Sequence, residues 1–160
     1  LLCLYYKVKG RLLEKYYYGY DEFAKDTQEL VDKCRGYEPD VLLAVARGGM
    51  TLSHLMAQAL DMRNLYALNS IHYEGTLKLN TFNVFNIPDM SKAKRVLIID
   101  DIVDSGETME EIFKILNEKF PETEFKLATI FYKKTAVLQP DYSVKEATQW
   151  IDFFWETDVK

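Results

Sequence analysis

The sequence predicts an α/β protein whose mainly parallel β-sheet carries helices on both faces. Apolar runs of strand length alternate along the chain with amphipathic segments of helical period, which favours right-handed crossovers between parallel strands. The run VLLAVA at 41–46 is apolar throughout, as is typical of a strand covered on both faces. A length of 160 residues suits one domain of ordinary size. Ligands of such sheets bind at the carboxyl ends of the strands.

Local patterns predict each element in turn. Residues 21–34 place Phe23, Leu30 and Val31 near one helical face behind an Asp21 cap. After the break at GYEPD we expect a strand at 41–46, a turn at 47–50, a helix at 51–60, a strand at 64–68, a strand at 95–99, a helix at 108–120 and a strand at 125–132. Residues 69–94 lack a sustained period, and a loop of that length is usually functional or mobile. The tail, 133–160, is aromatic and irregular.

We therefore expect one domain, 1–160, with a core at about 21–132, a mobile loop at about 69–94, and a small appendage made from about 133–160 and N-terminal residues. The net charge of -5 disfavours nucleic acid and anionic membranes as main partners, because these attract clustered Lys and Arg. The longest wholly apolar run, 41–46, is far shorter than the roughly 20 residues that cross a bilayer, so no integral membrane segment is expected. The 2 cysteines, Cys3 and Cys34, lack zinc-site spacing, which favours reduced thiols and a cytoplasmic location.

The segment VLIIDDIVDSGET, 96–108, carries the strongest chemical signal. It runs from a buried strand through a turn into a helix, whose first backbone amides form an anion site. The carboxylates of Asp100, Asp101 and Asp104 would repel a phosphate, since like charges about 4 Å apart cost roughly 4 kcal/mol at an effective dielectric of 20. Sugar hydroxyls and a hard cation such as Mg²⁺ satisfy carboxylates, so a phosphorylated sugar with magnesium fits the segment. The alternative is that the three aspartates only cap and solvate the strand end.

This segment resembles the phosphoribosyl-pyrophosphate motif of type I phosphoribosyltransferases. The resemblance implies the fold of that family, a mainly parallel sheet with helices on both faces plus a small hood from the termini. It implies that Asp100 and Asp101 hold ribose hydroxyls, directly or through Mg²⁺, and that Asp104 is the general acid/base beside the base. It also implies a cradle for the 5-phosphate made by Asp104, Ser105, Gly106, Glu107 and Thr108. The phosphate motifs G-x-x-x-x-G-K-[ST] and G-x-G-x-x-G are absent from the sequence.

The turn in AVARGGM, 44–50, should emerge at the same edge of the sheet. Arg47 offers a planar fork of donors suited to a diphosphate, although an arginine on a turn can also be merely solvated. The turn resembles the pyrophosphate loop of bacterial xanthine-guanine phosphoribosyltransferases, which implies that Arg47 and Gly48 bind substrate, that Arg47 takes part in catalysis, and that the Arg47–Gly48 peptide is cis. Residues 69–94 resemble the family's mobile catalytic loop, where a lid would keep water from the reacting sugar. His72 is left out of the catalytic set, because a lone histidine in a polar loop is usually solvated.

The tail resembles the family's base-binding region. Lys133 resembles the lysine that donates to the 6-oxygen of a purine, and Trp150 resembles the aromatic residue that stacks on the base. The resemblance places Ile151 and Asp152 at the 2-position of the ring. Lys134 departs from the family pattern, as does the DFF sequence after Ile151, and these departures leave the choice among purines open. Without the resemblance, the aromatic residues of the tail would be assigned to a core or an interface.

Together these features predict a purine phosphoribosyltransferase that transfers the 5-phosphoribosyl group from phosphoribosyl pyrophosphate to guanine, xanthine or hypoxanthine, with Mg²⁺ as cofactor. The partners are then small-molecule substrates, and the resemblance implies a homo-oligomer, a dimer or tetramer. Two alternatives remain open. One is a regulatory protein that senses phosphoribosyl pyrophosphate and binds nucleic acid, and the other is a phosphoribosyltransferase for a pyrimidine base.

Overall fold

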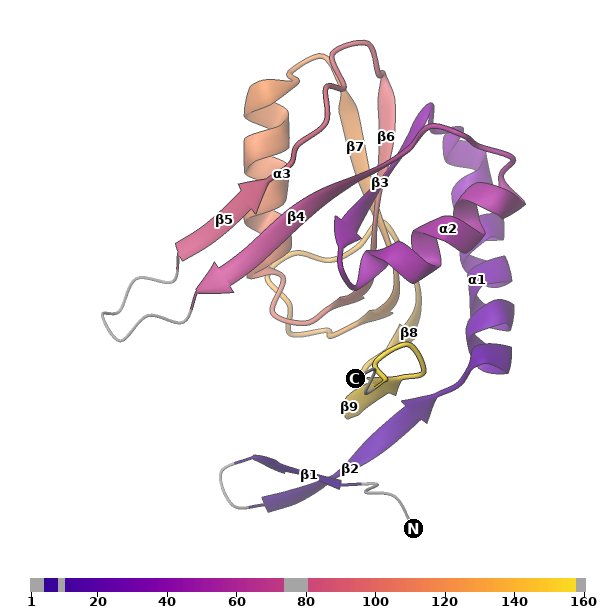
Figure 1. Ribbon diagram of the computed structural model, residues 1–160, viewed down its shortest axis with the longest axis vertical. Helices are drawn as coiled ribbons and strands as arrows, with labels where there is room; N and C mark the ends of the chain where they lie inside the picture. Colours follow the sequence, from indigo (N-terminus) through magenta and orange to yellow (C-terminus); the bar gives the residue numbers. More distant parts are fainter. Residues whose placement is uncertain (1–4, 9–10, 74–80, 158–160) are drawn as a thin grey trace.

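The computed structural model describes residues 5–8, 11–73 and 81–157, and its centre is a six-stranded sheet. The strand order is β5-β4-β3-β6-β7-β8 (Figure 1). The bounds are β3 Val41–Ala46, β4 Leu65–Tyr73, β5 Thr81–Phe85, β6 Arg95–Val103, β7 Glu124–Tyr132 and β8 Tyr142–Glu146. Every pairing is parallel except that of β5, which runs antiparallel to β4. The predicted α/β class with a mainly parallel sheet is confirmed.

Helices cover both faces of this sheet, as predicted. Their bounds are α1 Tyr20–Cys34, α2 Gly49–Ala59 and α3 Glu107–Lys119, and a short 3-10 turn, η1 Arg35–Tyr37, follows α1. In Figure 1, α1 and α2 lie on one side of the strands and α3 lies on the other. None of the helices in the described ranges is long and apolar enough to cross a membrane.

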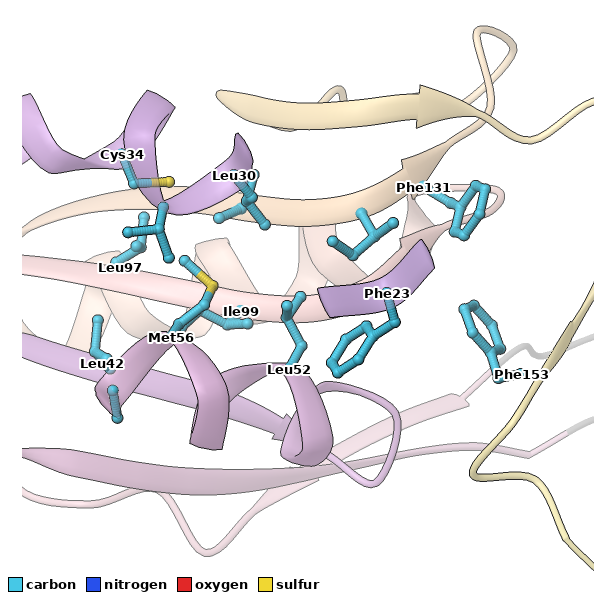
Figure 2. Close-up of a cluster of buried hydrophobic side chains, with 14 of the residues drawn as sticks. Phe23, Leu30, Cys34, Leu42, Leu52, Met56, Leu97, Ile99, Phe131 and Phe153 are labelled. Atoms are coloured by element: carbon cyan, nitrogen blue, oxygen red, sulfur yellow. The ribbon is translucent and has the colours of Figure 1, made fainter. Parts of the chain in front are cut away.

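Strand β6 contributes side chains to two buried hydrophobic cores, one on each face of the sheet. Successive side chains of a strand point to opposite faces. Leu97 and Ile99 therefore join the cluster under α1 and α2, where Figure 2 shows them near Met56 and Leu52, whereas Ile98 joins the cluster under α3. All five side chains are fully buried. Two buried cores fix the sheet rigidly, and its loops are the part left free to bind ligands.

A second, smaller sheet forms the predicted hood. Its strands are β1 Tyr5–Val8, β2 Arg11–Tyr18 and β9 Trp150–Phe153, in the order β1-β2-β9. The two ends of the chain meet here, because β2 and β9 pair in parallel with Lys15 opposite Trp150 (Figure 1). Phe153 packs into the same core cluster as Phe23 (Figure 2), which attaches the hood to the domain.

Two stretches contain more regular structure than the sequence predicted. The aperiodic stretch 69–94 holds the second half of β4 and all of β5, and its mobility stays a prediction. The family's mobile loop carries a short Ser/Tyr segment, to which SIHYEG, 70–75, corresponds by resemblance. Its residues 74–75 and the side chain of His72 lie outside the described part of the chain. The tail holds β8, so the main sheet extends beyond residue 132. Strand β8 (YSVKE) was not predicted because it is half polar and its partner β7 lies outside its local sequence.

Helix α1 begins one residue before Asp21. Its N-cap is Gly19 and not Asp21 as expected, and no side-chain hydrogen bond caps the helix.

Candidate active site

Two loops meet at the carboxyl ends of β3 and β6. These strands are parallel neighbours, so the loop at 46–49 and the loop at 103–107 emerge at the same edge of the sheet. A Cβ on Gly48 would lie 2.6 Å from Oδ2 of Asp101, and a Cβ on Gly49 would lie 2.2 Å from the carbonyl oxygen of Ile99. The two glycines are therefore required by close packing of the first loop against β6. This contact brings the predicted pyrophosphate loop against the predicted sugar-binding carboxylates.

The cis peptide in the first loop lies one bond earlier than the family resemblance implied. The Ala46–Arg47 bond is cis, and the expectation for Arg47–Gly48 was wrong. Gly48 already has helical torsions, φ -52° and ψ -47°, as the N-cap of α2. The turn between β3 and α2 lies at Arg47 and Gly48, and the side chain of Arg47 is exposed.

A cavity of about 980 Å³ opens beside this loop. Arg47, Gly48 and Asp101 line it, and so do four residues of the stretch expected to act as the catalytic loop: Asn69, Ser70, Ile71 and Phe85. The other lining residues were not predicted as site residues: Ala46, Trp155, Glu156 and Thr157. Asn69 reaches the cavity because it lies opposite Ala46 in the pairing of β4 with β3. The C-terminal residues carry no local pattern that places them here. The cavity mixes one cation, carboxylates and aromatic side chains, which suits a ligand with a charged and a flat part.

The two adjacent aspartates of β6 differ in position. Asp101 is only 8% exposed and lines the cavity, whereas Asp100 precedes it on the alternate side of the strand and accepts a hydrogen bond from the backbone N–H of Asp101 (2.9 Å). Burial, and next the charge of Asp101, raises the pKa of Asp100 well above its usual value. Burial raises the pKa of Asp101 to about 6. A cation or a hydroxyl donor brought by a ligand would therefore stabilise the ionised form of both carboxyl groups.

The raised pKa of Asp101 predicts a pH-dependent gain in stability for Asp101→Asn. The folded carboxyl, with a pKa of about 6 against an ordinary 3.8, holds its proton more tightly than the unfolded one. Its contribution to stability therefore falls as pH rises from about 4 to about 6 and stays low above that. The variant should match the wild type near pH 4 and exceed it by up to about 3 kcal/mol at pH 7.5. Urea unfolding at four pH values checks this, and a difference independent of pH would contradict it.

The acidic loop leads into α3 as an open helix N-terminus. Gly106 is its N-cap with a φ of 83°, a left-handed torsion that favours glycine, and a Cβ there would lie 2.7 Å from the backbone nitrogen of Leu138. Ser105 is exposed, and its Oγ accepts a hydrogen bond from the backbone N–H of Glu107 (3.3 Å). Thr108, partly buried, adds a hydroxyl in the first turn. This arrangement can bind a phosphate through backbone amides, hydroxyls and the helix dipole.

Lys133 joins this loop although 29 positions separate it from Asp104 in the chain. Strands β6 and β7 are parallel neighbours, and the backbone N–H of Lys133 donates to the carbonyl oxygen of Val103 (2.9 Å). Nζ of Lys133 lies 2.5 Å from Oδ1 of Asp104, and both side chains remain partly exposed. The predicted general acid/base and the predicted base-binding lysine therefore form an ion pair that a ligand can reach.

The residues predicted to bind the ring of the base lie on β9 and in the hood. Trp150 is 48% exposed, whereas the side chain of Ile151 is buried in the core cluster, which leaves its backbone for any ligand contact. Asp152 pairs with Lys15 at 3.6 Å. A second tryptophan, Trp155, stacks on Phe153 with ring centroids 4.6 Å apart and lines the cavity. The stacking role was assigned to Trp150 from the family resemblance, and Trp155 was not predicted as a site residue.

The donor set fits Mg²⁺ bound together with a substrate. Magnesium in substrate complexes takes one or two carboxylates, substrate oxygens and water. Asp101 offers two carboxylate oxygens at the wall of the cavity. Within the described ranges, no cluster of three or more His, Cys, Asp or Glu side chains could hold a metal by itself. The chain's own residues thus suit a cation that arrives with its substrate.

Comparison with known proteins decides the family. Residues 15–160 match the phosphoribosyl transferase domain. The chain belongs to the phosphoribosyltransferase family. A solved xanthine-guanine-hypoxanthine phosphoribosyltransferase of Helicobacter pylori superposes with a TM-score of 0.84 at 39% identity, covering 91% of this chain and 96% of that one. A purine phosphoribosyltransferase of Pyrococcus horikoshii gives a TM-score of 0.78 at 29% identity, with 91% and 96% covered. The xanthine-guanine phosphoribosyltransferase of Ruegeria sp. is 28% identical over 155 residues, covering 88% of this chain and 85% of the relative.

Proposed function

We propose that this phosphoribosyltransferase acts in purine salvage, transferring the 5-phosphoribosyl group from phosphoribosyl pyrophosphate to a 6-oxopurine and releasing pyrophosphate. The names of similar proteins support this class of acceptor, because the Helicobacter pylori enzyme is named for xanthine, guanine and hypoxanthine, and the Ruegeria relative for the first two. Lys133 supports it chemically, since an ammonium group donates to a 6-oxo group but cannot accept from a 6-amino group.

One observation carries the proposal: the packing of Gly48 against Asp101. It puts Arg47 and Asp101 on one cavity, so a diphosphate held by the guanidinium would have its ribose within reach of the carboxylate. The N-cap of α3, Gly106, lies five residues beyond Asp101, and this helix N-terminus suits the 5-phosphate of the same molecule. A ligand with a diphosphate, a sugar and a monophosphate therefore matches the order of these groups.

Substitution at the sugar breaks the bond from its anomeric carbon to the pyrophosphate oxygen and forms a bond from that carbon to a purine nitrogen. Arg47 binds the departing pyrophosphate and offsets its growing negative charge. Asp101, with Asp100 behind it, binds the ribose hydroxyls or the cation and offsets positive charge on the sugar. Bound Mg²⁺, held by Asp101 with Asp100, would supply further charge neutralisation for the pyrophosphate. Residues of β4 and β5 that line the cavity, such as Phe85, would exclude water.

The purine base lies between the acidic loop and the hood in this proposal. Lys133 donates to the 6-oxygen, Trp150 stacks on the ring, and the backbone of Ile151 meets its 2-position. Asp104 accepts the proton that the purine imidazole ring releases when the new bond forms. When a base binds, the ammonium of Lys133 must turn partly from Asp104 to the 6-oxygen, so the ion pair of the free protein supplies both groups at one place.

Pyrophosphate release tests the function directly. The purified chain, given phosphoribosyl pyrophosphate, should release pyrophosphate with guanine, xanthine or hypoxanthine and not with adenine or orotate. Removal of Mg²⁺ should abolish release. Activity with orotate alone would favour a pyrimidine enzyme. No release with any base, together with a shift of nucleic acid in a gel, would favour the regulatory alternative.

Replacement of Lys133 predicts a loss of base recognition. Lys133→Ala removes one charge-assisted hydrogen bond, so the KM for guanine should rise about 10- to 100-fold and selectivity against adenine should fall. The matched control is Lys134→Ala. In the unaltered chain, the ammonium of Lys134 pairs with Glu146 at 2.6 Å. That control should leave the KM nearly unchanged. Equal effects of the two substitutions would remove Lys133 from base recognition.

Two further expectations belong to this proposal. The family resemblance implies a dimer or tetramer, which sedimentation equilibrium of the purified chain would test. The salvage reaction and the reduced thiols expected from the sequence favour a cytoplasmic location. Cys34, the free cysteine that the structure describes, is fully buried, and burial raises the pKa of its thiol to about 12, so that it is chemically inert.

A further inference from the structure

The loop that follows Lys133 is closed by one exposed side chain, Gln139. Nε2 of Gln139 donates to the carbonyl oxygens of Ala136 (3.0 Å) and Lys133 (3.1 Å), and lies 3.5 Å from that of Lys134. A side-chain amide carries two N–H donors, so this group can bridge the loop from its last residue to its first. The backbone N–H of Ala136 also donates to the oxygen of Lys133 (3.0 Å). The loop at 133–139 is thus a compact turn built around the carbonyl of Lys133.

This turn also holds the acidic loop. The backbone N–H of Val137 donates to the carbonyl oxygen of Ser105 (2.8 Å), and the backbone of Leu138 fills the space that a side chain on Gly106 would need. At its other end, the N–H of Lys133 donates to Val103 (2.9 Å). The two loops are therefore joined on both sides of the Asp104–Lys133 ion pair.

We infer that Gln139 is a positioning residue, which sets where the ammonium of Lys133 meets a purine. The inference rests on the proposed function and deepens it. The backbone of Lys133 is fixed at its N–H by Val103 and at its carbonyl by Gln139 and Ala136. Without the Gln139 amide, the carbonyl loses its side-chain anchor and the turn can shift. Lys133 then reaches the 6-oxygen in a smaller fraction of encounters, while the residues around the main cavity are untouched.

Gln139→Met tests this, because methionine keeps the length of the side chain and removes both donors. The KM for guanine should rise about three- to tenfold, as expected for one lost hydrogen bond, with kcat within about twofold of the wild type. The KM for phosphoribosyl pyrophosphate should change less. The melting temperature should stay within about 2 °C, since the side chain is exposed. The matched control is Gln58→Met, an exposed glutamine of α2.

A double-mutant cycle with Lys133→Ala separates positioning from general loosening. If Gln139 acts through Lys133, Gln139→Met should add nothing to the KM for guanine in the Lys133→Ala background. An equal rise in both backgrounds, an unchanged KM, or a parallel fall of kcat and melting temperature would each overturn the inference. Failure of the proposed function would look different, because the unaltered chain would then release no pyrophosphate with any 6-oxopurine.

Discussion

Asp104→Asn is expected to lower kcat for pyrophosphate release by about 100- to 10,000-fold, the range that a positioned general acid/base contributes. Asparagine keeps the shape of the side chain but cannot accept the purine proton. The backbone of the acidic loop is held elsewhere, through Ser105 and Gly106, so the phosphate site should survive. The KM for phosphoribosyl pyrophosphate should therefore rise by less than about threefold. Steady-state kinetics with guanine measures both quantities.

Glu110→Gln is the matched control for this substitution. Glu110 is an exposed carboxylate in the first turn of α3, the helix that follows the acidic loop, so its neutralisation changes the net charge by the same amount near the same site. Turnover of this control should stay within about twofold of the wild type, because exposed charges are largely screened. If Asp104→Asn and Glu110→Gln had similar turnover, Asp104 would have no part in proton transfer.

Local sequence patterns predicted most of the central sheet, because a buried strand or helix face requires apolar residues at regular positions. Strand β3 is apolar without interruption and lies between two covered faces, so its bounds were predicted correctly. Helix α3 was predicted from the stripe that includes Met109, Ile112 and Leu116, all of which face the second core. Strand β8 was missed, since its side chains are all partly exposed and its pairing with β7 is not encoded nearby. When a strand forms mainly because it pairs with a neighbouring strand, the hydrophobic periodicity of its own sequence does not predict it.

The candidate site divides in the same way. The segment 96–108 places its charges, turn and helix start within one short motif, and the structure gives these parts the predicted order. Contacts between segments were not predictable. The ion pair of Asp104 with Lys133 depends on β6 and β7 being neighbours, and the place of Trp155 on the cavity depends on how the C-terminus folds back. The predicted fold and the motif together indicated which loops form the candidate site. Only the structure shows which side chains lie next to one another in it.

A buried polar network attaches the hood to the rest of the domain, so loss of one of its members should lower the stability of the protein markedly. Asp26 of α1, only 3% exposed, accepts hydrogen bonds from the hydroxyl of Tyr18 (2.8 Å) and from Nζ of Lys145 (2.7 Å). Lys145 also pairs with Glu22, which accepts a hydrogen bond from Tyr16. Burial, and next the hydrogen bond to Asp26, raises the pKa of Tyr18 well above its usual value, so its hydroxyl stays a donor. The network joins β2 of the hood, α1 and β8.

Asp26→Ala is expected to lower the free energy of unfolding by about 3 kcal/mol, because it leaves the fully buried hydroxyl of Tyr18 without its acceptor and removes one partner of Lys145. Urea unfolding at pH 7.5 measures this, with Asp32→Ala on the exposed face of the same helix as a control that should change stability by less than about 0.5 kcal/mol. Because Trp150 pairs through β9 with β2, a loosened hood should also raise the KM for guanine at temperatures where the variant stays folded. The KM for phosphoribosyl pyrophosphate should change less, since Arg47 and Asp101 belong to the main sheet and its loops. A variant as stable as the wild type would show that packing around Phe153 suffices to hold the hood.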